Sequence, residues 1–141
     1  MKLVDVNVLV YARDETSPHH RAAKHWLDHA LSGDTSIGFP WLVLVGFIRL
    51  VTHPSVMASP LSPSEAMDTV ESWLGARTAH VVRPGADHAR LMRESLEAAG
   101  TGGNLTNDAH LAALAIEHRA SVVSFDDDFD RFPGLRWERP R

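Results

Sequence analysis

Apolar residues run almost without interruption from Leu3 to Val10, and only Asp5 and Asn7 break the run. A continuous stretch rich in valine and leucine is typical of a strand that is buried on both faces, as in the interior of a parallel sheet. Residues 79–82 (AHVV) and 121–125 (SVVSF) are shorter stretches of the same kind. The pattern therefore predicts a long first strand and two short ones.

Other segments carry helix signals, namely apolar periodicity with capping residues or proline at the start and glycine or proline at the end. The predicted helices run from Ser17-Pro18 to about Leu31, from about Trp41 to Thr52, from the capping box Ser62-Pro63-Ser64-Glu65 through Leu74, from Ala89 through Ala98 to Gly100, and from Asn104 or Thr106 to about His118. His53-Pro54 ends the second helix because the residue before a proline is pushed out of the helical region. The glycines at 100–103 lack the lysine of a Walker loop and follow a helix, so we interpret them as a connector.

Strands that alternate with helices of ten or more residues are typical of βαβ units. The sequence therefore predicts an α/β fold, a three-layer α/β/α arrangement with a mostly parallel central sheet. A chain of 141 residues fits a single domain over residues 1–141 and can bury a conventional core.

Three acids lie at the edges of the apolar segments. Asp5 interrupts the first predicted strand, Asp126 directly follows the strand that ends at Phe125, and Asp108 falls in the first turn of a predicted helix. Sites in open α/β sheets form where the carboxyl ends of parallel strands meet, and a helix N-terminus favours an anion. We therefore expect the three carboxylates to share one site.

A cluster of carboxylates has an electrostatic cost. Two unit charges about 4 Å apart repel by roughly 4 kcal/mol at an effective dielectric constant of 20. A divalent cation removes this conflict, and oxygen ligands favour hard ions such as magnesium, with manganese as a close substitute. Such an ion activates water and stabilises charge on a phosphodiester, so hydrolysis of RNA or DNA is the reaction class that the acids indicate.

Each acid also has a purely structural interpretation. Asp5 could be held by an arginine or a backbone amide, and Asp108 could serve only to cap its helix. Asp126 opens an acidic turn with Asp127, Asp128 and Asp130, which could cap a short helix. The coincidence of all three favours chemistry over three separate structural roles.

Neighbouring polar residues suggest supporting roles. Asn7, two residues after Asp5, is expected on the same side of the strand, where it could orient the carboxylate or a metal-bound water. His25 and His29 lie four residues apart on one helix face, but without cysteine or a third ligand at a suitable spacing a zinc site is the weaker hypothesis. His110 lies two positions from Asp108, which in a helix is a different face.

Composition adds limits to this picture. The chain has no cysteine, which excludes disulfide and thiolate chemistry and fits a reducing cytoplasm. The first apolar run is too short and too polar for a signal peptide or a membrane span. Net charge is −4, so any contact with nucleic acid must be local. Four arginines close the chain and could be a solvated tail or phosphate contacts: Arg131, Arg136, Arg139 and Arg141.

Together these segments resemble the PIN-domain ribonucleases, specifically the VapC-type toxins of bacterial toxin–antitoxin pairs. The resemblance covers essentially the whole chain and rests on residues 4–9 (VDVNVL), 47–54 (FIRLVTHP), 105–113 (LTNDAHLAA), 123–129 (VSFDDDF) and 132–137 (FPGLRW). It implies a magnesium- or manganese-dependent endoribonuclease that cleaves RNA, forms a homodimer and is inhibited by a cognate antitoxin whose tail covers the cleft.

By this resemblance Asp5, Asp108 and Asp126 are the catalytic metal-site acids, and Asp128 is an outer helper. The chain departs from the family at one position, because many members carry a glutamate three residues before the arginine of the second helix. Here that position, three before Arg49, is Gly46. Either another group or water fills the gap, or the site is weakened.

Two functions of other classes stay open at this point. A phosphatase or phosphotransferase could use Asp5 as nucleophile, although this chemistry usually needs a second acid where Asn7 stands. A non-catalytic binding module could keep a vestigial cleft, and Gly46 is the best support for that alternative.

Overall fold

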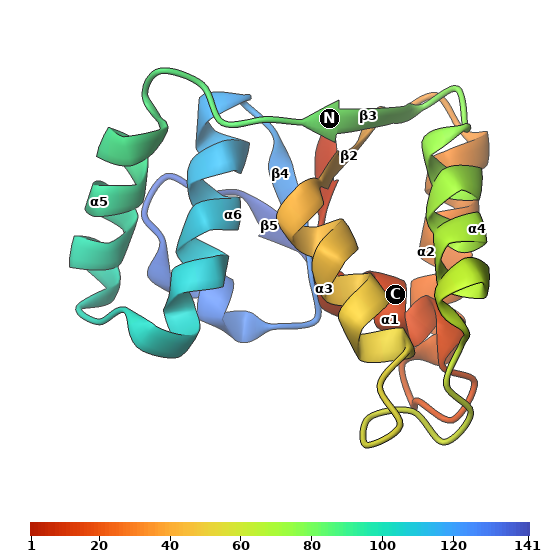
Figure 1. Cartoon of the computed structure of the whole chain (residues 1–141). Helices are drawn as coiled ribbons and strands as arrows, with labels where there is room; N and C mark the ends of the chain where they lie inside the picture. The colour runs from red at the N-terminus through yellow and green to blue at the C-terminus, as the bar shows by residue number, and fades with distance from the viewer.

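A single sheet of parallel strands organises the structure, a computed structural model that describes all residues from Met1 to Arg141 (Figure 1). The strand order is β3-β2-β1-β4-β5. The strands are β1 (Lys2–Val4), β2 (Ile37–Pro40), β3 (Ala79–Val82), β4 (Ser121–Val123) and β5 (Trp137–Glu138). Every neighbouring pair is parallel, which confirms the predicted α/β fold with its parallel central sheet.

Helices fill the connections between the strands. They are α1 (Val6–Arg13), α2 (His20–Ser32), α3 (Trp41–Val51), α4 (Pro63–Leu74), α5 (His88–Ala99) and α6 (Thr106–Glu117), with 3-10 turns η1 (Gly103–Leu105) and η2 (Asp127–Arg131). The chain moves from β1 to β3 in one direction and then returns past β1 to β4. Right-handed crossovers therefore place α1 to α4 on one face of the sheet, and α5 with α6 on the other. Figure 1 shows α5 and α6 packed side by side.

The first strand is much shorter than predicted. It ends at Val4, and the apolar residues after it form α1, whose Val8, Leu9 and Val10 are buried. Asp5 caps this helix, because its side chain accepts a hydrogen bond from the amide of Val6. A short run of apolar residues does not distinguish a buried strand from a buried helix, so the prediction of a strand to Val10 was wrong.

Two strands were not predicted. β2 contains Gly38 and Pro40, which are rare inside strands, and β5 is only two residues long. β2 nevertheless pairs on both sides, with Lys2 opposite Ile37 and Phe39 opposite Val81. A Cβ atom at Gly38 would lie 2.3 Å from the Leu3 Cδ2 atom and 2.7 Å from the Val82 Cγ2 atom. Glycine is therefore needed here for packing between neighbouring strands.

Most helix boundaries follow the capping signals. The capping box of α4 is present, with reciprocal hydrogen bonds between Ser62 and Glu65, each of 3.1 Å. Two boundaries and one predicted cap differ from the structure. β4 ends at Val123 instead of Phe125, and α2 begins at His20 instead of Ser17, whose hydroxyl accepts a hydrogen bond from His19 within the preceding turn. α6 has no side-chain cap because η1 leads directly into it. None of the helices is both long enough and apolar enough to cross a membrane.

Substitution of Gly38 by alanine should lower the free energy of unfolding by about 1–3 kcal/mol, because the added methyl group overpacks the space between Leu3 and Val82. Chemical denaturation measures this change. Gly102→Ala is the control, since the nearest atom to its added Cβ would be the Thr106 hydroxyl oxygen at 3.6 Å. Equal stability of the two variants would contradict the packing argument.

Candidate active site

Asp5 lies between the end of β1 and the start of α1, and it is only 7% exposed. One carboxylate oxygen accepts a hydrogen bond from the Val6 amide at 2.7 Å. The other accepts from the Ser124 hydroxyl at 2.6 Å and from the Asn7 side-chain amide at 3.1 Å. Burial raises the pKa of Asp5, and the bonds from Ser124 and Val6 partly offset this rise. The charge is thus held by an amide and two polar side chains, with no arginine in contact.

Asn7 connects the first helix to the loop after β4. Its amide nitrogen donates to Asp5 and, at 3.0 Å, to the Ser124 hydroxyl, while its oxygen accepts from the Phe125 backbone amide at 3.1 Å. The expected contact with Asp5 is therefore present. The predicted strand geometry behind it was wrong, because Asn7 lies in the first turn of α1.

Ser124 is a central residue that sequence reasoning missed. It is fully buried, and its hydroxyl oxygen also accepts a hydrogen bond from the Asp126 backbone amide at 3.0 Å. One hydroxyl thus connects Asp5, Asn7 and the loop that carries Asp126. A serine inside the apolar stretch SVVSF was the only available signal, since a buried hydroxyl requires a partner.

The other acids come from two further elements. Asp108 lies in the first turn of α6, and Asp126 caps η2 by accepting a hydrogen bond from the Asp128 amide at 2.9 Å. Asp108, Asp126 and Asp128 each offer a carboxylate oxygen, and these three oxygens lie within 4.8 Å of one another. Asp128, expected only as an outer helper, therefore belongs to the tightest group of acids. The purely structural roles considered for two of the acids are also partly present: Asp126 caps η2, and Asp108 lies in the first turn of α6.

The proximity of these acids changes the pKa of Asp108. Burial is the largest cause, and the negative charges of Asp5, Asp126 and Asp128 add to it, so that the pKa rises to about 7. Only burial and like charges act on Asp108. Arg131 pairs with Asp128, but no cation of the protein lowers the pKa of Asp108.

A cleft of about 240 Å³ contains Asp5, Asp108 and Asp126. One wall is α3, which presents one helical face to the cleft: Leu42, Val43, Gly46, Arg49 and Leu50. The acids thus all come from the other elements, and α3 contributes no carboxylate. A Cβ atom at Gly46 would lie 3.2 Å from the Val6 Cγ2 atom, so the helix passes close to α1 at this point.

This set of ligands fits a divalent cation. Clustered carboxylate oxygens are typical ligands of hard ions such as magnesium and manganese, and a bound ion would relieve the repulsion that raises the pKa of Asp108. The histidines do not form a comparable group. His25 and His29 are exposed on α2, and His110 instead contacts His88 at 2.9 Å.

Three of the four closing arginines contact their own chain. Arg131 donates to Asp128 at 3.2 Å, Arg136 donates to the Arg119 carbonyl at 3.3 Å, and Arg139 pairs with Asp127. These three arginines therefore have structural partners within the chain.

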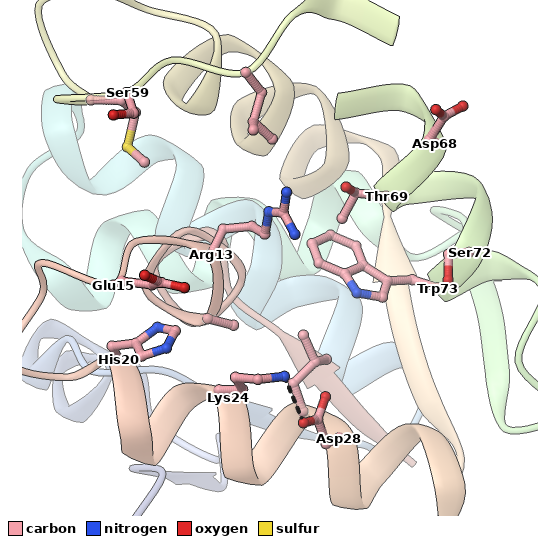
Figure 2. A pocket seen from close by; sticks show the side chains of 14 residues that line it. Arg13, Glu15, His20, Lys24, Asp28, Ser59, Asp68, Thr69, Ser72 and Trp73 are labelled. Atoms are coloured by element: carbon pink, nitrogen blue, oxygen red, sulfur yellow. Dashed lines mark hydrogen bonds and ion pairs between the residues drawn. The ribbon is translucent and has the colours of Figure 1, made fainter. Parts of the chain in front are cut away.

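A larger cavity of about 530 Å³ lies away from the acids, against α1, α2 and α4. Figure 2 shows Arg13 pointing into it near Trp73, and Lys24 paired with Asp28 on its rim at 2.9 Å. Its charges are mixed, and it includes none of the three predicted site acids. The chemistry that the sequence predicted is therefore confined to the smaller, acidic cleft.

Comparison with known proteins gives a consistent result. Residues 2–135 match the family described as PIN domain. The chain is 51% identical to ribonuclease VapC37 of Mycobacterium tuberculosis over 140 residues, which covers 99% of this chain and 97% of that protein. It is 41% identical to ribonuclease VapC43 of the same species, over 99% of this chain and 95% of the other.

Solved structures share the fold. The toxin–antitoxin complex VapBC2 from Rickettsia felis, bound to a DNA fragment from its promoter, contains a chain that superposes with a TM-score of 0.71 at 22% identity, over 99% of this chain and 98% of that one. VapC20 of Mycobacterium tuberculosis, described as a sarcin–ricin loop cleaving toxin, gives a TM-score of 0.69 at 17% identity, over 96% and 99%.

Substitution of Ser124 by alanine should lower the free energy of unfolding by about 1–3 kcal/mol, because it removes one hydrogen bond to the buried Asp5 carboxylate and leaves the Asp126 amide without a partner. Urea denaturation measures the loss. Ser121→Ala, at the start of β4, is the matched control, since the Ser121 hydroxyl forms no hydrogen bond that the substitution would remove. A loss at Ser124 no larger than at Ser121 would exclude a structural role for the hydroxyl.

The raised pKa of Asp108 predicts a pH-dependent stability in the presence of a chelator. The folded protein binds this proton more tightly than the unfolded chain, so it loses stability as pH rises from about 4 towards 7. Asp108→Asn should therefore raise Tm by a few degrees at about pH 8, and the gain should shrink as the pH falls and disappear below about pH 4. Asp68→Asn, at an exposed acid on α4, is the control. A gain that is independent of pH would contradict the assignment.

Proposed function

This chain belongs to the PIN-domain family and its VapC ribonucleases, and on that premise we propose that it is a magnesium- or manganese-dependent endoribonuclease, the toxin of a toxin–antitoxin pair. One observation carries the proposal. Carboxylates from three separate elements converge in one cleft, where burial and, after it, their mutual repulsion raise the pKa of Asp108 to about 7. Such an arrangement costs stability in the absence of a cation, which a metal-dependent function explains.

Asp5, Asp108 and Asp126 are the proposed catalytic residues and metal ligands, with Asp128 close enough to share this role. These residues would hold a divalent ion, which would lower the pKa of water and stabilise negative charge on a phosphodiester oxygen. Hydrolysis of the RNA backbone is the reaction that this chemistry supports.

Asn7 and Ser124 are proposed as positioning residues. Their hydrogen bonds hold the Asp5 carboxylate and connect it to the loop of Asp126, so two of the acids keep a fixed relation to each other. Groups that orient metal ligands in this way typically change metal affinity or activity by about 10–100-fold when they are removed.

A nucleophilic role for Asp5 is less well supported. Both of its oxygens accept hydrogen bonds, and an amide stands where a phosphotransferase would need a second acid. A binding module without activity has one observation in its favour, since α3 places Gly46 in the cleft where the family often has a glutamate. Asp108, Asp126 and Asp128 still offer three carboxylate oxygens within 4.8 Å of one another without that residue, which favours the enzyme.

The relatives support a proposal about the partner of this chain. Several similar structures are described as VapBC complexes, and by analogy we propose a cognate antitoxin for this chain. We further propose that residues 1–141 form one PIN-like domain, that the protein is a homodimer, and that it acts in the cytoplasm. The single five-stranded sheet and the absence of cysteine are consistent with this proposal.

Purified protein without antitoxin should cleave RNA when magnesium or manganese is added and should stop when the ion is chelated. Asp5→Asn should reduce kcat by about 100-fold or more, since it removes a proposed ligand of the ion that stabilises charge on the phosphodiester. Gel analysis of labelled RNA pools measures both effects, and Asp68→Asn should keep full activity. Cleavage without metal, or full activity of Asp5→Asn, would overturn the proposal, and metal binding without any cleavage would support the binding module.

A further inference from the structure

The acidic cleft contains one cationic side chain. Arg49 lines it from α3, one helical turn after Gly46, while the other charged residues of the cleft are the acids Asp5, Asp108 and Asp126. Spacing explains the position, because residues 42, 46, 49 and 50 share one face of the helix. The absence of a side chain at Gly46 leaves the cleft open between Arg49 and the acids.

The guanidinium group of Arg49 is not used by the protein itself. Its side chain is exposed, and it makes neither a hydrogen bond nor an ion pair, although arginines elsewhere do both. It therefore forms no ion pair with the carboxylates that line the same cleft. The positively charged guanidinium group of Arg49 thus lies in the cleft without a partner within the protein.

The opposite wall, at the start of α6, carries two neutral side chains without a partner next to Asp108. Asn104 and Asn107, beside the first turn of α6, line the same cleft, and both are exposed. Neither side chain forms a hydrogen bond within the chain. The cleft therefore presents free donors on both sides of the acids, which is the arrangement that an anionic chain needs in order to enter past several carboxylates.

We propose that Arg49 is a substrate-binding residue that holds a phosphate of the RNA backbone next to the carboxylate cluster. The inference rests on the proposed ribonuclease function and adds the group that binds the substrate. The planar guanidinium matches two phosphate oxygens at once, which fixes orientation as well as charge. Gly46 supports this role, because a glutamate there would lie one turn from Arg49 and would pair with it.

Binding of RNA separates this role from a structural one. The probe is a short fluorescent single-stranded RNA, measured in magnesium buffer with Asp5→Asn protein so that the RNA stays intact. Arg49→Gln in this background should reduce the slope of log affinity against log salt concentration by about 0.7, the loss of one phosphate contact. Arg49→Lys should keep the slope, because it keeps the charge. Arg77→Ala is the control. Arg77 pairs with Asp34 and precedes β3, so it lies at the amino end of the strands, opposite the end that carries the acids.

Cleavage is measured with the same substitutions in the protein that retains Asp5. Arg49→Gln should lower kcat/KM by about 10- to 100-fold, and Arg49→Lys should recover only part of this, because lysine lacks the bidentate fork. A salt slope for Arg49→Gln equal to that of Arg77→Ala would overturn the inference, whether or not RNA is cleaved. Failure of the protein with native Asp5 and Arg49 to cleave RNA would instead overturn the ribonuclease function, and the salt slope would still decide the role of Arg49.

Discussion

Repulsion among carboxylates at one edge of the sheet is the constraint on which the proposed active site depends. Asp5, Asp108, Asp126 and Asp128 come from three elements, and burial together with their mutual repulsion raises the pKa of Asp108 to about 7. A structure that keeps them together must fix each one separately. Asp5, Asp108 and Asp126 are each fixed by their position at the start of a helix, and the hydroxyl of Ser124 connects Asp5 to Asp126. The fold thus keeps the carboxylates close together although they repel one another.

The sequence predicted the class of fold and the three acids, because both depend on local signals: apolar segments, capping residues, and charges that interrupt an apolar run. It did not predict β2, whose Gly38 is explained only by the side chains of neighbouring strands. It also extended β1 through Val10, since a buried helix and a buried strand have the same apolar composition. Ser124 was missed for a similar reason, because the partners of its hydroxyl are about 119 residues away or in a loop.

The two walls of the cleft have different properties. The acids come from the loops after β1 and β4 and from α6, whereas α3 contributes apolar residues, Gly46 and Arg49. Carboxylates suited to a metal ion thus face a cation suited to a phosphate, and a nucleic-acid backbone needs both. The departure from the family at Gly46 is then consistent with an active site, because it leaves Arg49 free to contact substrate.

Calorimetric titration of the protein with manganese in buffers of different ionisation enthalpy tests the central claim most directly. If the carboxylates form the metal site, binding at about pH 6 must release close to one proton, since Asp108 is protonated there, whereas binding at about pH 8 must release almost none. Asp108→Asn should abolish the proton release. Absence of binding, or binding with the same proton release at both pH values, would contradict a metal site in this cleft.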